Sequence, residues 1–255
     1  MNQAAVQYAE QAIYYIDKKE RIKNYWAKRS HDFADLRLKE LSSPLAGRWL
    51  DEICRYLPKE KNLRILDIGT GTGFFAFLLE SMGHRVTGID LTPSMIEEAK
   101  NIGRKLNSGA HFRVMDAEQL LYRDESFDVI ITRNLTWTLP NPESAYAEWF
   151  RVLKKGGIML NFDGNYGKEN FAEDEDELPE NHAHKSIGND LMRECERIKD
   201  QLEISYHVRP AWDVEILEKA GFEKLELNLG VSRRIYQEID EFYNPTPLFM
   251  IKATK

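Results

Sequence analysis

Three glycines follow an aspartate between Ile65 and Leu79, and their spacing suits a ligand-binding turn. The segment reads ILDIGTGTGFFAFLL, with Asp67 two residues before the first glycine and with Gly69, Gly71 and Gly73 at alternate positions. Glycine lets the backbone approach a ligand closely, and a helix that starts after the last glycine points free N–H groups toward it. The Asp67 carboxylate at the mouth of this turn favours a positively charged ligand.

Two phosphate-binding interpretations fit this turn less well. A dinucleotide turn has the spacing G-x-G-x-x-G, whereas the spacing here is G-x-G-x-G, and the Asp67 carboxylate would repel a pyrophosphate. A mononucleotide P-loop needs a lysine directly after the glycines, and none follows them here. S-adenosylmethionine is the third candidate, because it carries a sulfonium and an ammonium but no phosphate. Asp67 could alternatively serve only to cap the turn.

The elements around the turn alternate as expected for a doubly wound α/β sheet. Short runs rich in Val, Ile, Leu and Phe alternate with helical patterns, which is typical of parallel strands covered on both faces. Ligands of such sheets bind beyond the carboxyl ends of the strands, where the glycine turn stands. The expected strands are Arg64 to Ile68, Arg85 to Ile89, Ala110 to Met115, Phe127 to Arg133, Gly157 to Phe162, Lys224 to Leu229 and Leu248 to Ala253.

Two segments lie outside this alternation. Residues 1–60 are mostly helical in pattern, with a break in LSSPLAG, and we expect them to form an N-terminal helical cap on the domain of residues 61–255. A polar, acidic insert follows the fifth strand at about residues 164–209. Its run Glu173 to Glu177 is typical of a solvated loop.

Composition excludes several classes of partner. The 255 residues carry a formal net charge of -7 and show no long block of Lys and Arg, so we expect no nucleic acid partner. No apolar run is long enough to span a bilayer, and the N-terminal residues lack the apolar core of a signal peptide. We therefore expect no membrane association and a cytoplasmic location. Cys54 and Cys195 stand far apart, which favours reduced thiols.

The motifs and their order resemble the class I S-adenosylmethionine-dependent methyltransferases, in the small-molecule branch of ubiquinone/menaquinone-type (methyltransferase-11-like) enzymes. The resemblance covers about Leu63 to Phe162 and is carried by LDIGTGTG, GIDLTPSM, RVMDAEQLLY and the unit that ends in VLKKGGIMLNFD. It implies a Rossmann-like seven-stranded, mostly parallel sheet whose last strand is antiparallel. It also implies S-adenosylmethionine as cofactor, S-adenosylhomocysteine as product and in-line methyl transfer to a small-molecule acceptor.

The same resemblance assigns roles to individual residues. Asp90 would accept hydrogen bonds from the ribose hydroxyls, Leu91 and Met95 would flank the adenine, and Asp116 with Ala117 would bind its polar edge. Asp116 could instead cap a short helix through Leu120. The expected cofactor-binding residues are Arg29, Asp67, Gly69, Thr70, Gly71, Asp90, Leu91, Met95, Asp116, Ala117 and Asn134.

Arg29 belongs to a helical stripe with Tyr25, Trp26 and Phe33. Such a stripe is often core, whereas related enzymes use an aromatic residue and an arginine before the first strand to close over the carboxylate of the cofactor. We expect Arg29 to form that salt bridge.

The acceptor site is less defined than the cofactor site. Candidate residues near the end of the sheet and in the insert are Trp137, Tyr166, His182, His207 and Trp212, and no single residue stands out as a general base. His182 and His184 lie near carboxylates, but we expect a solvated loop and no metal. The acidity of the insert favours a cationic or amine acceptor. A protein or RNA methyltransferase and a non-catalytic cofactor-binding regulator stay open as alternatives, as do a monomer and a homodimer.

Overall fold

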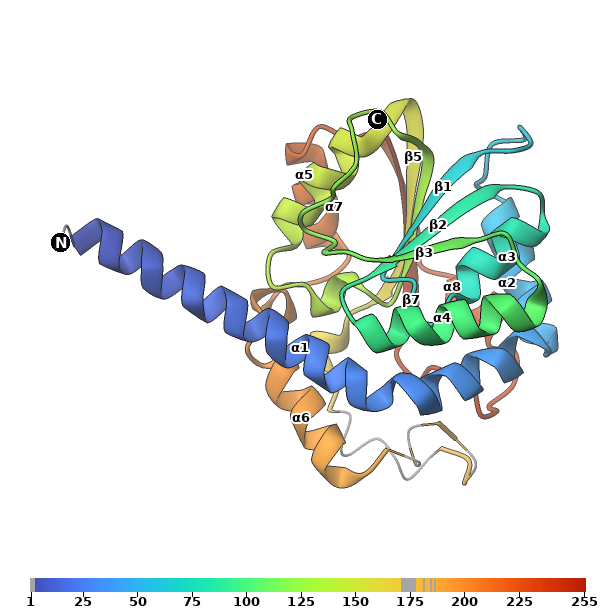
Figure 1. Ribbon diagram of the computed structural model, residues 1–255, viewed down its shortest axis with the longest axis horizontal. Helices are drawn as coiled ribbons and strands as arrows, with labels where there is room; N and C mark the ends of the chain where they lie inside the picture. Colours follow the sequence, from blue (N-terminus) through green and yellow to red (C-terminus); the bar gives the residue numbers. More distant parts are fainter. Residues whose placement is uncertain (1–2, 171–177, 181, 184, 186) are drawn as a thin grey trace.

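The computed structural model describes residues 3–170, 178–180, 182–183, 185 and 187–255, which form a sheet covered by helices on both faces (Figure 1). The described residues form one seven-stranded sheet of order β3-β2-β1-β4-β5-β7-β6. Strand β7 pairs antiparallel with both of its neighbours, and the other observed pairings are parallel. The predicted fold class is confirmed. The strands are β1 (Arg64–Ile68), β2 (Arg85–Asp90), β3 (His111–Val114), β4 (Phe127–Arg133), β5 (Leu153–Gly164), β6 (Glu223–Asn228) and β7 (Leu248–Thr254).

Two apolar clusters hold the helices to the sheet. On one face, Trp49 and Phe75 pack edge to face with Phe162 of β5, in a cluster that also contains residues of α1, α3, α4 and α8. On the other face, Tyr146 and Trp149 of α5 pack with residues of α7. The helices are α1 (Gln3–Leu41), α2 (Pro44–Cys54), α3 (Phe74–Ser81), α4 (Pro93–Leu106), α5 (Pro142–Val152), α6 (Asn189–Lys199), α7 (Ala211–Lys219) and α8 (Val231–Ile235), with short 3₁₀ turns η1 (Thr136–Thr138), η2 (Tyr166–Lys168) and η3 (Glu203–Tyr206).

The strand order reverses direction between β1 and β4, and this reversal places the glycine turn at the site where such sheets bind ligands. Strand β1 pairs with β2 on one side and with β4 on the other. The chain segments that leave the carboxyl ends of these three strands therefore meet around one point. The helix that follows the glycine turn, α3, begins at Phe74, directly after Gly73.

The N-terminal segment is a long helix followed by a short one. Helix α1 packs along α4 and α6, and its first turns extend beyond the rest of the molecule (Figure 1). The break lies at Ser43, whose hydroxyl accepts a hydrogen bond from the Leu45 N–H, and Pro44 opens α2. In the described part of the chain, no helix has the length and apolar character needed to cross a membrane.

Strand β5 begins earlier than its sequence suggests. The sequence predicts a strand that starts at Gly157, but α5 stops at Val152 and the strand starts at Leu153. The reason lies in the partners of this segment: Leu153 pairs with Phe127 of β4, and the Gly156 N–H donates to the Lys255 carbonyl over 2.7 Å. Both partners are far away in the sequence.

Candidate functional site

A cavity of about 250 Å³ lies between the carboxyl ends of the strands and one face of α1. The sheet side contributes the glycine turn and the segments that follow β2, β3 and β4. The helix side contributes residues that recur at three- and four-residue spacing, which places them on one face of α1. These residues are Lys19, Ile22, Tyr25, Trp26, Arg29, Phe33, Leu36 and Arg37.

All of the expected cofactor-binding residues line this one cavity. They come from α1, the glycine turn, the segment after β2, the segment after β3 and the end of β4. These residues are Arg29, Asp67, Gly69, Thr70, Gly71, Asp90, Leu91, Met95, Asp116, Ala117 and Asn134. The fold thus brings together residues that are separated by about a hundred positions in the chain.

The glycine turn is shaped so that side chains are excluded from it. Gly69 and Gly71 have positive φ angles of 66° and 54°, which favour glycine. A Cβ at Gly69 would lie 2.7 Å from Cδ1 of Leu135, and one at Gly71 would lie 3.2 Å from Cε1 of Phe33. The backbone of the turn therefore runs close to the cavity walls on both sides.

Asp67 is a buried carboxyl beside the cavity. It is 2% exposed, and its Oδ2 accepts a hydrogen bond from the Thr70 hydroxyl over 2.6 Å. Burial raises the pKa of Asp67 to about 7, against the lowering effect of that hydrogen bond. A cationic ligand in the cavity would stabilise its ionised form. Both interpretations of Asp67 are therefore compatible with its position, since it braces the turn and lines the cavity.

Asp90 holds the two segments that meet at the end of β2. Its Oδ2 accepts from the Gly71 N–H over 3.1 Å, and its Oδ1 accepts from the Thr92 N–H over 2.8 Å. Burial raises the pKa of Asp90, and these two backbone hydrogen bonds oppose the rise. The Asp90 carboxylate lines the cavity with part of its acceptor capacity used for structure.

Asp116 sits in a turn and not at the start of a helix. Its Oδ1 accepts from the Glu118 N–H over 2.9 Å, which is a local turn bond. The ammonium of Lys19 on α1 pairs with both Asp116 and Glu118. The sequence interpretation missed Lys19 and Glu118. The signal for Lys19 was present, because it shares the helical face of Arg29 and Phe33.

Arg29 extends from α1 along the aromatic wall of the cavity. Its Nη1 donates to the Tyr25 hydroxyl over 3.2 Å, and its guanidinium lies 5.7 Å from the centre of the Trp26 ring. Tyr25 is almost fully buried, so the stripe serves as core on one side and as cavity wall on the other. Among the described residues, no carboxylate forms an ion pair with Arg29.

Three polar side chains form a chain of hydrogen bonds on the far wall of the cavity. The Tyr166 hydroxyl donates to Oδ1 of Asn134 over 3.0 Å and accepts from Nδ2 of Asn244 over 2.7 Å. The ring of Trp137 lies 5.0 Å from that of Tyr166. Burial raises the pKa of Tyr166 well above its ordinary value, so its hydroxyl stays protonated and orients Asn134 instead of acting as a base. Asn244 was not found from the sequence.

The remaining acceptor candidates divide between the cavity and the outside. His182 lines the cavity, and its Nε2 lies 2.7 Å from the Tyr243 carbonyl oxygen. His207 and Trp212 do not line it: their rings stack on each other at 4.7 Å between centres and 10° between planes. The expectation that these two residues face an acceptor is corrected on this point. The physical reason is this stacking contact, which pairs the two rings with each other.

The histidine and acidic segments of the insert give no metal site among the residues that can be described. His184 and the run Glu173 to Glu177 lie outside those residues. Within residues 3–170, 178–180, 182–183, 185 and 187–255, no group of three His, Cys, Asp or Glu side chains is placed to hold a metal ion.

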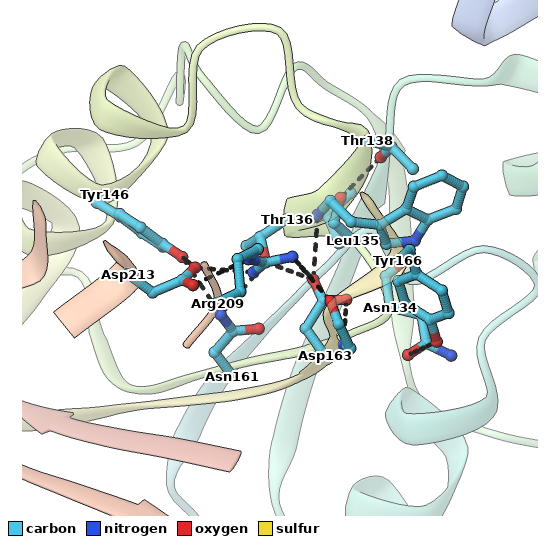
Figure 2. A network of polar contacts seen from close by, with 12 residues as sticks. Asn134, Leu135, Thr136, Thr138, Tyr146, Asn161, Asp163, Tyr166, Arg209 and Asp213 are labelled. Atoms are coloured by element: carbon cyan, nitrogen blue, oxygen red, sulfur yellow. Dashed lines mark hydrogen bonds and ion pairs between the residues drawn. The ribbon is translucent and has the colours of Figure 1, made fainter. Parts of the chain in front are cut away.

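A buried network fastens the segment after β4 to the end of β5 and to α7 (Figure 2). Arg209 donates to both oxygens of Asp213, over 2.9 and 2.7 Å, and to the Thr136 hydroxyl over 2.5 Å. Asp163 accepts from that same hydroxyl and lies 3.5 Å from Arg209. Tyr146 completes the network by donating to Asp213 over 2.6 Å. The sequence gives no periodic signal for this network, because its members lie far apart in the chain.

A second buried ionic cluster lies beside the cavity. Glu40 of α1 forms ion pairs with Arg37 and with Arg133, the latter at 2.9 Å. The guanidinium of Arg133 also lies over the ring of Trp49, 4.5 Å from its centre. Both arginines line the cavity, and the sequence interpretation identified neither.

Comparison with protein families and with known proteins identifies a methyltransferase domain in this chain. A family model described as "Methyltransferase domain" matches residues 59–221. The chain is 38% identical over 102 residues to ubiquinone/menaquinone biosynthesis C-methyltransferase of Desulfotalea psychrophila, covering 39% of this chain and 41% of that protein. It is 28% identical over 142 residues to ubiquinone biosynthesis O-methyltransferase of Cereibacter sphaeroides, covering 56% and 57%.

A solved structure shares the fold across most of the chain. It is phosphoethanolamine N-methyltransferase 2 of Haemonchus contortus in complex with S-adenosyl-L-methionine, with a TM-score of 0.57 at 20% identity, covering 81% of this chain and 51% of that one. The matches to the curated relatives span only about half of their lengths or less, so they bear on the domain rather than on the whole of those proteins.

Proposed function

The chain belongs to the methyltransferase domain family, and from this premise we propose that it is an S-adenosylmethionine-dependent methyltransferase acting on a small-molecule acceptor. The methyl group would pass by in-line displacement, with S-adenosylhomocysteine as the product. One observation carries the proposal: residues that the sequence motifs assign to one cofactor lie on separate segments, yet line a single cavity.

The donor set of the cavity fits this cofactor. The buried carboxyl of Asp67 and the partly buried carboxyl of Asp90 suit a ligand with positive charge and hydroxyl groups. The glycine turn offers backbone without side chains, since a Cβ at Gly69 would collide with Leu135. Met95 and Ala117 add apolar surface for a flat ring. We propose that these residues hold the cofactor.

S-adenosylmethionine, when bound, supplies a methyl group already activated by the sulfonium. The chain then has to align the acceptor and exclude water. The aromatic face of α1 with Tyr25, Trp26 and Phe33 closes the cavity on the side away from the sheet. Asn134 is held by Tyr166 and by a backbone bond to the Phe162 carbonyl over 2.8 Å, which fixes the wall opposite that helix.

The walls of the cavity support a small acceptor. Aromatic side chains from several elements line it, among them Trp26, Phe33, Trp137 and Tyr236, and such walls suit an acceptor with an apolar ring. The named activities of two relatives, ubiquinone/menaquinone biosynthesis C-methylation and ubiquinone biosynthesis O-methylation, are in line with this class of acceptor.

Two measurements test the proposal. Isothermal titration of the purified chain with S-adenosylhomocysteine should give saturable binding, and the dinucleotides NAD and FAD should not compete. Incubation with methyl-labelled S-adenosylmethionine and a metabolite extract should then yield a dialysable labelled product. A labelled macromolecule would instead support a protein or RNA acceptor, and binding without any transfer would support a regulatory role.

A further inference from the structure

The ionic cluster beside the cavity carries more positive than negative charge. Glu40 is fully buried and is shared by two guanidinium groups, those of Arg37 and Arg133. The side chains of Arg37 and Arg133 are only 15% and 10% exposed. Among the described ion pairs, one carboxylate for two guanidinium groups leaves one unbalanced positive charge in a largely dry environment, which is costly unless a further anion is nearby.

The protein itself balances this charge only in part. The rings of Trp49, Phe74 and Phe75 lie against Arg133, at 4.5, 5.1 and 5.7 Å from its guanidinium carbon. Cation–π contacts of this kind recover a fraction of the desolvation cost. Asp67 interacts electrostatically with Arg133, but burial raises its pKa to about 7, so at neutral pH this carboxyl is only partly ionised.

Arg133 also has donors without a partner in the described part of the chain. Its Nη2 contacts Glu40 and lies 3.4 Å from the Tyr236 hydroxyl. Its Nε and Nη1 are buried and have no hydrogen-bond partner among the residues that the structure describes. Buried donors of a charged group are seldom left unpaired, because the lost hydration is not replaced. Arg133 lines the cavity, and a guanidinium with unsatisfied donors in such a place suits a planar oxyanion.

We propose that Arg133, with Arg37, binds an anionic oxygen group of the methyl acceptor. This inference rests on the proposed function and narrows it: the acceptor is a small aromatic acid, either a carboxylic acid or an acidic phenol. Its ring would contact the aromatic walls at Phe33, Trp137 and Tyr236, and its anion would offset the excess charge of the cluster. The expectation of a cationic acceptor rested on the acidic run Glu173 to Glu177, which lies outside the described residues.

Such an acceptor also agrees with the groups available for proton transfer. Burial raises the pKa of Tyr166 and Tyr236, so neither hydroxyl is a base at neutral pH. An aromatic acid loses its proton to solvent before it enters the cavity. The nucleophilic atom of the anion then forms a bond to the methyl carbon, the carbon–sulfur bond breaks, and its electron pair stays on sulfur.

The test compares matched charged and neutral probes on the chain saturated with S-adenosylhomocysteine. Benzoate and 4-nitrophenolate should bind about tenfold or more tightly than benzamide and nitrobenzene, as measured by calorimetry. Arg133→Gln should abolish this preference, and Glu40→Gln, which adds to the excess charge, should strengthen it. Arg197→Gln is the matched control, because Arg197 is an exposed arginine of α6 outside the cavity lining.

Three results with the unaltered chain and with Arg133→Gln would overturn the inference. One is equal binding of charged and neutral probes by the unaltered chain, and another is a preference that survives Arg133→Gln. The third is a loss of S-adenosylhomocysteine affinity in Arg133→Gln without loss of affinity for methylthioadenosine, which lacks the carboxylate; Arg133 would then bind the cofactor. If Arg133→Gln does not fold, Glu40→Gln decides, because unchanged anion affinity there contradicts the role of the cluster. If the unaltered chain does not bind S-adenosylhomocysteine, the proposed function is contradicted. The cluster can still be tested in that case, by measuring whether the ligand-free chain binds the charged probes more tightly than the neutral ones.

Discussion

The Asp163 carboxylate at the end of β5 accepts a hydrogen bond from the backbone N–H of Trp137 in η1, over 3.1 Å. This bond crosses from the sheet to the wall of the cavity. The same oxygen, Oδ2, lies 3.5 Å from Nη1 of Arg209, which also binds Asp213 of α7. The position of the Trp137 ring is therefore set by buried charges that do not themselves line the cavity.

Loss of Arg209 should destabilise the whole domain. Arg209→Met would leave Asp163 and Asp213, both fully buried, without their shared cation. Removing one partner of a buried ion pair typically costs about 3 to 5 kcal/mol, and we expect that loss in the free energy of unfolding measured with urea. Lys219→Met is the control, because the exposed pair of Lys219 with Glu215 should leave the midpoint unchanged. Equal midpoints for the unaltered chain and Arg209→Met would contradict this role of the network.

Two glycine variants can separate the effect of backbone strain on stability from the effect of ligand contact on affinity. Gly69→Ala places a Cβ in a left-handed conformation and 2.7 Å from Cδ1 of Leu135. Gly156→Ala imposes similar strain at a φ of 73°, with no atom within 4 Å of the new Cβ. Both variants should lose about 1 kcal/mol of stability from strain. Only Gly69→Ala should also lose affinity for S-adenosylhomocysteine, in a calorimetric titration, and a similar loss in Gly156→Ala would remove the argument for close approach at Gly69.

The sheet and the first motif were predictable because their signals are local. The apolar run Arg64 to Ile68 and the glycines after it define both a strand and a turn within a few residues. Strand β1 spans the predicted residues, and α3 begins directly after Gly73, as predicted. The start of β5 was not predictable in the same way. It depends on the pairing of Leu153 with Phe127 and on the backbone hydrogen bonds of Gly156 and Gly157 to Lys255, and only the folded sheet brings these residues together.

The residues of the candidate site also divide into those with a local sequence signal and those without one. Asp67 lies near the end of β1 and Asp90 ends β2, where ligands of this fold bind, so local sequence was sufficient to select them as candidates. Arg133 and Glu40 could not be recognised, because a charged residue at a strand end or in a helix is ordinarily solvated, and only tertiary packing buries this pair. His207 shows the reverse case: its residue type suggests chemistry, but its ring stacks on Trp212 outside the cavity.

Arg29 offers a direct test of the cofactor end of the cavity. If its guanidinium pairs with the carboxylate of the cofactor, Arg29→Ala should weaken S-adenosylhomocysteine binding about tenfold or more, which corresponds to a charge-assisted hydrogen bond of about 1.5 to 3 kcal/mol. Arg29→Lys should recover part of that loss. Affinity for methylthioadenosine, which has no carboxylate, should be unchanged in both variants. Unaltered affinity for S-adenosylhomocysteine in Arg29→Ala would show that the assignment is wrong.

Asp67 should make the stability of the free chain depend on pH. Burial raises its pKa from an ordinary 3.8 to about 7, so between these values the folded chain keeps a proton that the unfolded chain releases. Its contribution to the free energy of unfolding is therefore complete below about pH 4 and is lost as the pH rises to about 7. Urea unfolding across this range should show a shallower decline for Asp67→Asn than for the unaltered chain. Parallel curves for the two proteins would contradict the raised pKa.

The same carboxyl should give cofactor binding the opposite pH dependence. A cationic ligand stabilises ionised Asp67, so the affinity for S-adenosylmethionine should rise by about tenfold between pH 6 and pH 8, as expected when one group with a pKa of about 7 must lose its proton. S-adenosylhomocysteine, which lacks the sulfonium, should show a smaller rise, and Asp67→Asn should remove the rise for both ligands. Asp128→Asn is the matched control, because Asp128 lies at the opposite end of β4 and pairs with Lys154. Calorimetric titrations at pH 6, 7 and 8 measure these affinities; a flat profile for the unaltered chain would mean that Asp67 only braces the turn through Thr70.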